Sequence, residues 1–246
     1  MSTKNINIKN DATGQAILAF FNGKYGFEVV ERNDGYVIGG SNSQYFAEYN
    51  DWPIYEKKAI KCAKGKILDI GCGAGKHSLY LQKKGYDIMA IDSSPLAIQV
   101  CRKRGVENAH IISINTLNKI KQKFDTVLLL GNNFGLLQNN KTAVKILKEL
   151  YKITSDKAII IAESSNPYKN LDEANVIYQK NNRKQGRMSG QRKIRIRFRE
   201  YTSSWFDYLG VSEDEMKKIL KNANWQIKEI FYSEGSSYIA LITKLI

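Results

Sequence analysis

The segment Ile67–His77, with the sequence ILDIGCGAGKH, constrains the fold of this chain more than any other feature. Its first four residues are typical of a buried strand, three glycines follow in alternate positions, and a helical pattern begins at Lys76. Glycine permits a tight turn and lets a ligand approach bare backbone. The start of the next helix offers free N–H groups and a partial positive charge to an anionic group. The segment therefore predicts a strand, a ligand-binding turn and a helix.

From Lys66 onward, short apolar runs alternate with amphipathic helical patterns. This βαβ order predicts a Rossmann-like, mostly parallel sheet with helices on both faces. Near the end, Ser212 and Glu215 form a capping-box signature, and a turn at 233–236 separates two strands, which predicts an antiparallel last strand. The expected strands are 67–70, 86–91, 109–113, 124–130, 157–163, 225–232 and 237–243, and the expected helices of this part are 76–84, 95–104, 142–153 and 212–223.

Two further segments flank or interrupt this pattern. The start of the chain reads as a tail followed by helical stretches at 14–22 and 45–64, so an N-terminal helical cover is expected. Within 164–211, residues 192–200 alternate between cationic and apolar side chains and 205–211 is a second strand candidate, which predicts an inserted β-hairpin lid. We expect three parts: the tail and cover at 1–60, a core at 61–163 plus 212–246, and the inserted hairpin at 164–211.

The positive charge of the chain is concentrated in this insertion. The 246 residues include 38 Lys and Arg against 24 Asp and Glu, a net charge of +14. Nine of these charges fall in 180–199, which contains no acid. Such a segment is typical of a site for an anionic small molecule or for RNA phosphates. A solvated edge strand protected by charge against aggregation is a third interpretation, and all three stay open.

Composition excludes several other classes of protein. With 43% hydrophobic and 25% charged residues, the chain is expected to be globular rather than disordered. Its apolar runs are far shorter than a membrane span, and no apolar signal region is visible near the start. The three cysteines include no C-x-x-C pair, so neither a disulfide framework nor a zinc or other metal site is expected. These features predict a cytoplasmic protein without a membrane partner.

The glycine-rich turn is compared with three cofactor-binding patterns. A dinucleotide fingerprint fails because Lys76 stands where its third glycine should be, and a P-loop fails at Ile70 and His77. Asp92, at the end of the next expected strand, could accept hydrogen bonds from ribose hydroxyls. The D-x-G-x-G-x-G pattern, Asp92 and the seven-strand plan with an antiparallel last strand resemble class I S-adenosylmethionine (SAM) methyltransferases, over more than half of the chain.

The resemblance implies SAM as cofactor and a role for each matching residue. The glycines would pass close to the methionine and ribose, Asp69 would orient the loop, and Asp92 would bind the ribose. Residues after the next two strands would contact the adenine and the region of the sulfonium. The implied cofactor-binding residues are Asp69, Gly71, Cys72, Gly73, Gly75, Asp92, Ser93, Ile114, Asn115, Gly131 and Asn132.

Other polar and aromatic residues are candidates for catalysis or substrate binding. Ligands of open α/β sheets bind beyond the carboxyl ends of the strands, where His77, Glu163 and Asn132 are expected. His77 could instead have only a packing role, and Glu163 could instead hold backbone amides; both alternatives stay open. Tyr45 and Tyr49 would share one helical face of the cover, or only pack there. The candidate substrate-binding residues are Tyr45, Tyr49, Asn133, Arg195 and Arg197.

The resemblance leaves the acceptor undecided. We expect methyl transfer to an oxygen or nitrogen atom of a small molecule, and the basic hairpin leaves an anionic acceptor open. The alternatives are an RNA methyltransferase that uses the basic hairpin, and a non-catalytic SAM-binding protein. Asn132-Asn133-Phe134 differs from the N-P-P-Y signature of enzymes that methylate nucleic-acid amino groups, which favours the small molecule. The hairpin also resembles lid or dimerising hairpins, so a homodimer stays open.

Overall fold

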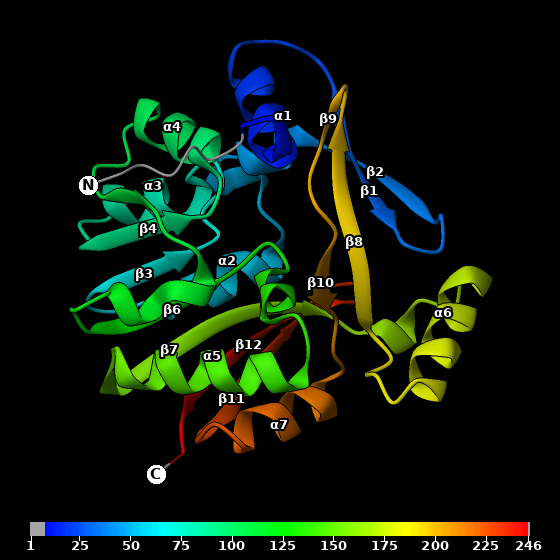
Figure 1. Cartoon of the computed structure of the whole chain (residues 1–246). Coiled ribbons are helices and arrows are strands. Elements are labelled where there is room, and N and C mark those ends of the chain that lie inside the picture. Colours follow the sequence, from blue (N-terminus) through cyan, green and yellow to red (C-terminus); the bar gives the residue numbers. More distant parts are fainter. Residues whose placement is uncertain (1–7, 246) are drawn as a thin grey trace.

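The computed structural model describes residues 8–245, and most of the expected tail lies outside this range. Its larger sheet has seven strands in the order β11-β12-β7-β6-β3-β4-β5 (Figure 1). Strand β12 pairs antiparallel with both β7 and β11, and the pairs between β7 and β5 are parallel, as the sequence predicts. The strands are β3 (Ile67–Ile70), β4 (Ile88–Asp92), β5 (Ala109–Ile111), β6 (Phe124–Leu129), β7 (Thr154–Ser165), β11 (Trp225–Tyr232) and β12 (Ser237–Lys244).

Helices bury both faces of this core sheet. On one face, α5 (Asn140–Lys152) and α7 (Glu213–Lys221) pack their apolar sides against the strands, with Trp225 fully buried between them. The other face is covered by α2 (Ile54–Ile60), α3 (Lys76–Lys83) and α4 (Pro95–Lys103). The capping box of Ser212 and Glu215 is present at the start of α7. Because helices cover both faces of the sheet, a binding site is expected beyond the carboxyl ends of β3, β4, β6 and β7.

A second sheet joins segments that are about 160 residues apart in sequence. Its strands are β1 (Phe27–Arg32), β2 (Val37–Ser41), β8 (Gln191–Phe198), β9 (Tyr201–Thr202) and β10 (Phe206–Leu209). The strand order is β10-β8-β1-β2, with β9 beside β8, and all pairs are antiparallel. Helix α1 (Ala12–Phe21) packs on this sheet, and α6 (Glu173–Lys184) lies where β1 ends and β8 begins, with Asn175 bonded to Arg32 (Figure 1).

This second sheet corrects two expectations from the sequence. The inserted hairpin is present as β8 and β10, but it does not stand alone because β1 occupies the other edge of β8. The N-terminal part is not only helical: a β-hairpin follows α1, and the stretch 45–64 is divided into two short 3₁₀ turns and α2. Pro53 explains the division, since proline disfavours helix in the residue before it and starts a new helix easily. The cover and the insertion are therefore one structural unit.

Among the described residues, no helix is long and apolar enough to cross a membrane.

Candidate functional site

The glycine-rich loop between β3 and α3 has the geometry that its sequence predicts. Gly71, Gly73 and Gly75 have φ angles of 71°, 54° and 81°, a region that other residues rarely adopt. A Cβ atom at Gly75 would lie 2.8 Å from the Cys101 sulfur and from a methyl of Val106. Gly75 thus lets α3 pack closely on α4. Gly71 and Gly73 let other side chains approach, since a Cβ atom there would lie 2.5 Å from Asn133 Nδ2 and 3.2 Å from the Tyr45 ring.

Asp92 ends β4 beside this loop. Its Oδ2 accepts a hydrogen bond from the Gly73 amide at 3.0 Å, and its Oδ1 accepts one from the Ser94 amide at 2.8 Å. Burial raises the pKa of Asp92, and these two amides oppose that effect. Each carboxylate oxygen keeps a second lone pair, so Asp92 can orient the loop and accept hydrogen bonds from a diol at the same time.

The other residues implied for the cofactor lie around the same edge. Asp69 is buried in β3, where its Oδ2 accepts a hydrogen bond from the Ser78 hydroxyl at 2.6 Å and ties the strand to α3. Ser93 and Asn115 are exposed, whereas Ile114 and Cys72 are buried. The structure therefore brings the loop and the ends of β4, β5 and β6 together, as expected. The Asp69 carboxylate instead binds Ser78 of α3.

The turn after β6 is held from two sides. Glu163, at the end of β7, accepts hydrogen bonds at its Oε2 from the amides of Gly131 (2.7 Å) and Asn132 (3.1 Å). Its Oε1 accepts one from the Tyr55 hydroxyl at 2.9 Å. From the second sheet, the Tyr208 hydroxyl donates to the Asn132 carbonyl at 2.6 Å. Both oxygens of Glu163 thus have protein partners, which favours the amide-holding interpretation.

Asn132 itself adopts a left-handed conformation with φ 62°. Its Oδ1 is buried, and no described residue donates a hydrogen bond to it. The next residue, Asn133, donates from Nδ2 to the carbonyl groups of Ile70 and Gly71, both at 3.0 Å. Asn133 therefore ties the β6 turn to the glycine loop, whereas the side chain of Asn132 keeps an acceptor for a ligand.

His77 is bound to another helix rather than open to the site. Its Nε2 lies 2.6 Å from Glu56 Oε1, its ring packs on Trp52 in an edge-on arrangement, and Lys76 Nζ also contacts Glu56 at 2.7 Å. Burial acts to raise the pKa of Glu56, but the hydrogen bonds from His77 and Lys76 hold it below its ordinary value. This buried cluster favours a structural role for His77, which joins α3 to α2.

The two tyrosines of the cover are separated by the break in the expected helix. Tyr49 stacks on Tyr80 with ring centroids 4.4 Å apart, which is a packing role. Tyr45 lies against the glycine loop, since a Cβ atom at Gly73 would be 3.2 Å from its ring. The expectation that both share one helical face is wrong, and only Tyr45 lies at the site.

Tyr45 leads to a carboxylate that the sequence analysis missed. Its hydroxyl donates to Glu28 Oε1 at 2.7 Å, and Glu28 is only 6% exposed. The second oxygen, Oε2, is buried without a hydrogen-bond partner among the described residues. Burial raises the pKa of Glu28 above its ordinary value of 4.5, and the bond from Tyr45 offsets only part of this. In the sequence, only the two-residue period of β1 could have indicated that Glu28 lies on the buried face of the strand.

We expect the replacement Glu28→Gln to raise the unfolding temperature at pH 7. A carboxyl with a raised pKa stabilises the fold below pH 4.5, and this stability is lost as the pH rises through the pKa of the folded state. Each tenfold gain in proton affinity corresponds to about 1.4 kcal/mol, or about 3–5 °C for a chain of this size. Thermal unfolding between pH 4 and 8 should show a gain that disappears near pH 4.

The variant Tyr45→Phe provides the matched control. It removes the donor that stabilises the charged form of Glu28, so its unfolding temperature should fall more steeply with pH than that of the wild type. An unchanged pH dependence in Glu28→Gln would contradict the assignment.

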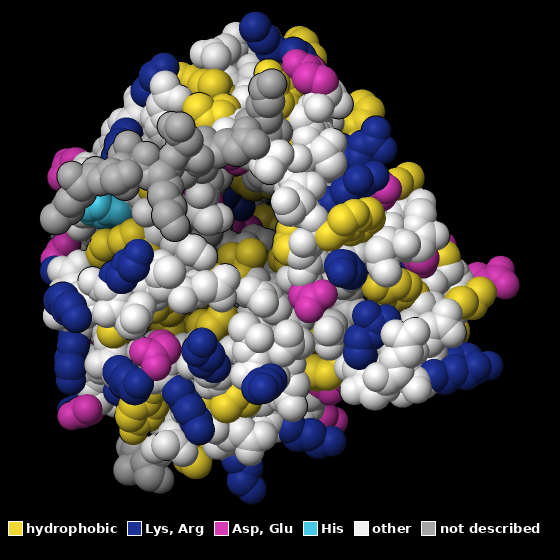
Figure 2. All heavy atoms as spheres, viewed as in Figure 1, with side chains coloured by type: hydrophobic (Ala, Val, Ile, Leu, Met, Phe, Trp, Pro, Cys, Tyr) yellow, Lys and Arg dark blue, Asp and Glu magenta, His cyan; other side chains and the backbone are white. Residues whose placement is uncertain are grey.

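The cationic side of β8 faces outward and is partly neutralised. Arg195 forms two hydrogen bonds of 2.9 Å with Glu31 of β1, and Arg197 contacts the same carboxylate at 3.3 Å. These arginines are thus on the side opposite to the buried Ile194 and Ile196. The structure does not bring Arg195 and Arg197 to the glycine loop. Figure 2 shows that the surface is instead hollowed between the core and the second sheet, where Figure 1 places α1 and β10.

Comparisons with known proteins agree with this geometry. A family described as "Methyltransferase domain" matches residues 67–157. A SAM-dependent methyltransferase from Bacteroides fragilis, solved with S-adenosyl-L-homocysteine, has a TM-score of 0.85 at 24% identity over 98% of both chains. Over 122 residues, this chain is 30% identical to a glycine/sarcosine N-methyltransferase of Halorhodospira halochloris. Residues 67–157 therefore match a methyltransferase domain, and the chain shares the fold of the Bacteroides fragilis SAM-dependent methyltransferase.

The similarity to curated methyltransferases covers only part of each chain. The Halorhodospira match spans 47% of this chain and 45% of that protein, and a putative methyltransferase of Bacillus subtilis, YqeM, is 20% identical over 50% of this chain and 51% of its own length. The chain thus spans about half the length of these relatives. The residues present fit SAM, because the Asp92 carboxylate beside the glycine loop can accept the ribose hydroxyls and because the buried Asn132 Oδ1 has no donor among the described residues.

Proposed function

We propose that this chain transfers a methyl group from SAM to an oxygen or nitrogen atom of a small molecule. The observation that supports this most is the enclosure of the strand ends by the second sheet. Tyr45 packs on Gly73, and Tyr208 donates to the Asn132 carbonyl, so a cover lies over both the cofactor loop and the β6 turn. A covered site of this kind suits a small acceptor that is held inside it.

SAM, when bound, supplies a methyl group that is already activated on a sulfonium. The protein therefore has to align donor and acceptor, and alignment alone contributes about 7–11 kcal/mol in favourable cases. Glu163 and Tyr208 position the β6 turn, and Asn132 Oδ1 offers an acceptor to a substrate N–H or O–H.

RNA remains the second expectation, but the structure supports it less. Its phosphates would have to bind the outer side of β8, where Glu31 already pairs with Arg195 and Arg197. A site for RNA requires cations that are free to replace bound counterions, and a shared carboxylate reduces their number.

A labelled-methyl experiment tests the proposal. The protein is incubated with SAM carrying a labelled methyl group and with cell extract that has been separated into small molecules and RNA. Glycine and sarcosine, after the names of the relatives, are included as single acceptors. We expect label in the small-molecule fraction and no label with Asp92→Ala. Label in RNA alone, or no transfer by a protein that binds SAM, would contradict it.

A further inference from the structure

The inner side of the second sheet carries two arginines that the sequence pattern did not single out. The β1–β8 register places Arg32 opposite Ile194, and the β8–β10 register places Tyr208 opposite Arg192. Opposed residues of an antiparallel pair project to the same face, so Arg32 and Arg192 are diagonal neighbours on the side of the buried Ile194. They lie on the opposite face from Arg195 and Arg197.

Arg192 has no counter-ion within the described part of the chain. Its guanidinium makes no hydrogen bond or ion pair there, although Arg32 binds Asp34 through two 2.8 Å hydrogen bonds and Asn175 at 2.6 Å. Burial lowers the pKa of Arg192, and the charge of Arg32 adds to this. The groups that act to raise the pKa of Arg192 are Tyr208 and Tyr178, and no carboxylate is among them. Arg192 is half-buried, so its guanidinium keeps donors for water or for an anion, and an anionic ligand would neutralise its unpaired charge.

The two arginines line a small cavity of about 50 Å³. This is room for a carboxylate or for a few water molecules. The polar side chains around it can donate several hydrogen bonds. Besides Arg32 and Arg192, they include Ser165, Asn175, Gln179 and Ser189.

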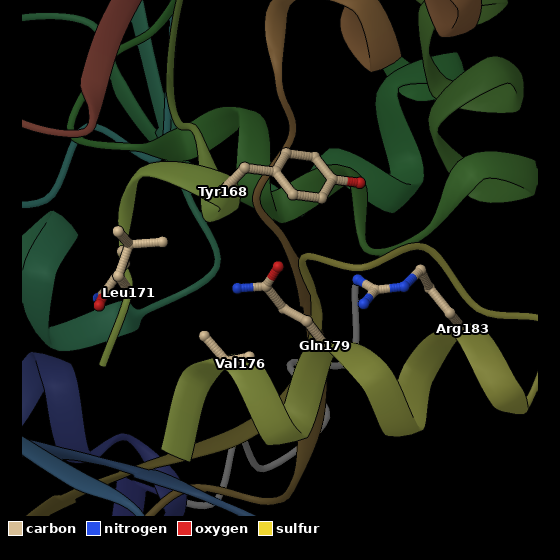
Figure 3. Close-up of a pocket in the computed structure, with 6 residues that line it drawn as sticks. Tyr168, Leu171, Val176, Gln179 and Arg183 are labelled. Carbon is tan, nitrogen blue, oxygen red and sulfur yellow. The ribbon is translucent and has the colours of Figure 1, made fainter. Parts of the chain in front are cut away.

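The cavity adjoins the candidate methyl-transfer site. Ser165 is two residues beyond Glu163 on β7, and Tyr208, opposite Arg192, donates to the Asn132 carbonyl. On its outer side, the cavity shares Asn170 and Gln179 with an open pocket of about 310 Å³. Figure 3 shows Gln179 and Val176 projecting from α6 between Tyr168 and Leu171 in this pocket. The arginines therefore lie between the reaction centre and the outside.

We propose that Arg192, supported by Arg32, binds a carboxylate group of the methyl acceptor in this cavity. A carboxylate fits because the planar guanidinium fork matches its two oxygens and because the cavity is small. The inference rests on the proposed function and narrows its substrate to molecules that bear a carboxylate. It also transfers the expected anion-binding role from the outer arginines of β8 to the inner one.

The test uses Arg192→Met, which keeps the volume but removes the charge, and Lys180→Met, which removes an exposed charge from α6. Thermal unfolding is measured with acetate, with acetamide and with inorganic phosphate at constant ionic strength. For the wild type and Lys180→Met, acetate at ten times its Kd should raise the unfolding temperature by about 3–5 °C. In Arg192→Met the Kd should rise about tenfold or more. Acetamide should have no effect.

A second readout separates ligand binding from a structural role. Without ligand, Arg192→Met should unfold at the same or a higher temperature than the wild type, because a half-buried charge without a counter-ion is removed. A large fall would show that Arg192 stabilises the fold and would overturn the proposal. Equal responses of wild type and Arg192→Met to acetate, or protection by phosphate alone, would also overturn it. Binding of S-adenosylhomocysteine, measured in parallel by calorimetry, tests the proposed function separately: if it binds and acetate does not, only the carboxylate site fails.

Discussion

Replacing Asp92 with alanine is expected to weaken the binding of S-adenosylhomocysteine by about 10- to 150-fold. Hydrogen bonds to a charged group contribute about 1.5–3 kcal/mol, and a ribose offers two donors to this carboxylate. The same substitution releases the Gly73 amide, so the glycine loop also loses an anchor. Isothermal titration calorimetry measures the affinity directly and needs no knowledge of the acceptor.

Two variants separate the parts of this effect. Asp92→Asn keeps one side-chain oxygen for a backbone amide but removes the charge, so we expect an intermediate affinity. Asp87→Ala removes an exposed acid just before the start of β4, whose carboxylate forms an ion pair with Lys66 at 3.0 Å, and should bind as the wild type does. Wild-type affinity in Asp92→Ala would contradict the assignment of the ribose site.

Replacing Glu163 with alanine is expected to destabilise the fold by about 3 kcal/mol. The change removes the acceptor of three partly buried donors, the amides of Gly131 and Asn132 and the Tyr55 hydroxyl, and each of these hydrogen bonds contributes about 1 kcal/mol. For a chain of this size, the unfolding temperature should fall by about 6–12 °C. Hydrogen exchange of the Gly131 and Asn132 amides should become faster, since the β6 turn is no longer held.

The control for Glu163 is the isosteric amide. Glu163→Gln retains an oxygen for the two amides and an NH₂ group that can face Tyr55, so its loss of stability should be about 1 kcal/mol. Methyl transfer should fall more in the alanine variant, because small displacements of a reacting pair can reduce a rate by about 10²-fold. Slow exchange of both amides in Glu163→Ala would show that the turn is ordered without Glu163.

Much of the core could be predicted because its signals are local. The expected strand 67–70 coincides with β3, and the helices after it begin and end within about two residues of the expected positions. Positive φ angles at Gly71, Gly73 and Gly75 follow from the residue type and the turn. The helix expected at 45–64 is not formed as one element. Tyr45 and Tyr49 have helical spacing, but Pro53 interrupts the helix before α2.

The roles of single polar residues were harder to predict than the elements that hold them. His77 follows the glycine loop in sequence, but its ring contacts Glu56 and Trp52, which α2 and the segment before it contribute. Glu163 stands at the expected strand end, but the tertiary structure supplies three donors that occupy its carboxylate. The chemistry of a side chain depends on partners that are distant in sequence, and a local sequence pattern does not predict which residues these are.

The strand, glycine loop and helix, Asp92 at the next strand end, and the antiparallel last strand can be read from the amino-acid sequence, because short-range sterics and burial periodicity encode them. The pairing of β1 with β8 became visible only in the folded chain. An alternating strand can pair with any other exposed edge, so periodicity specifies its two faces but not its partner. This pairing directs Arg195 and Arg197 to Glu31 on the outside, and it places Glu28, Arg32 and Arg192 on the inner face that covers the glycine loop.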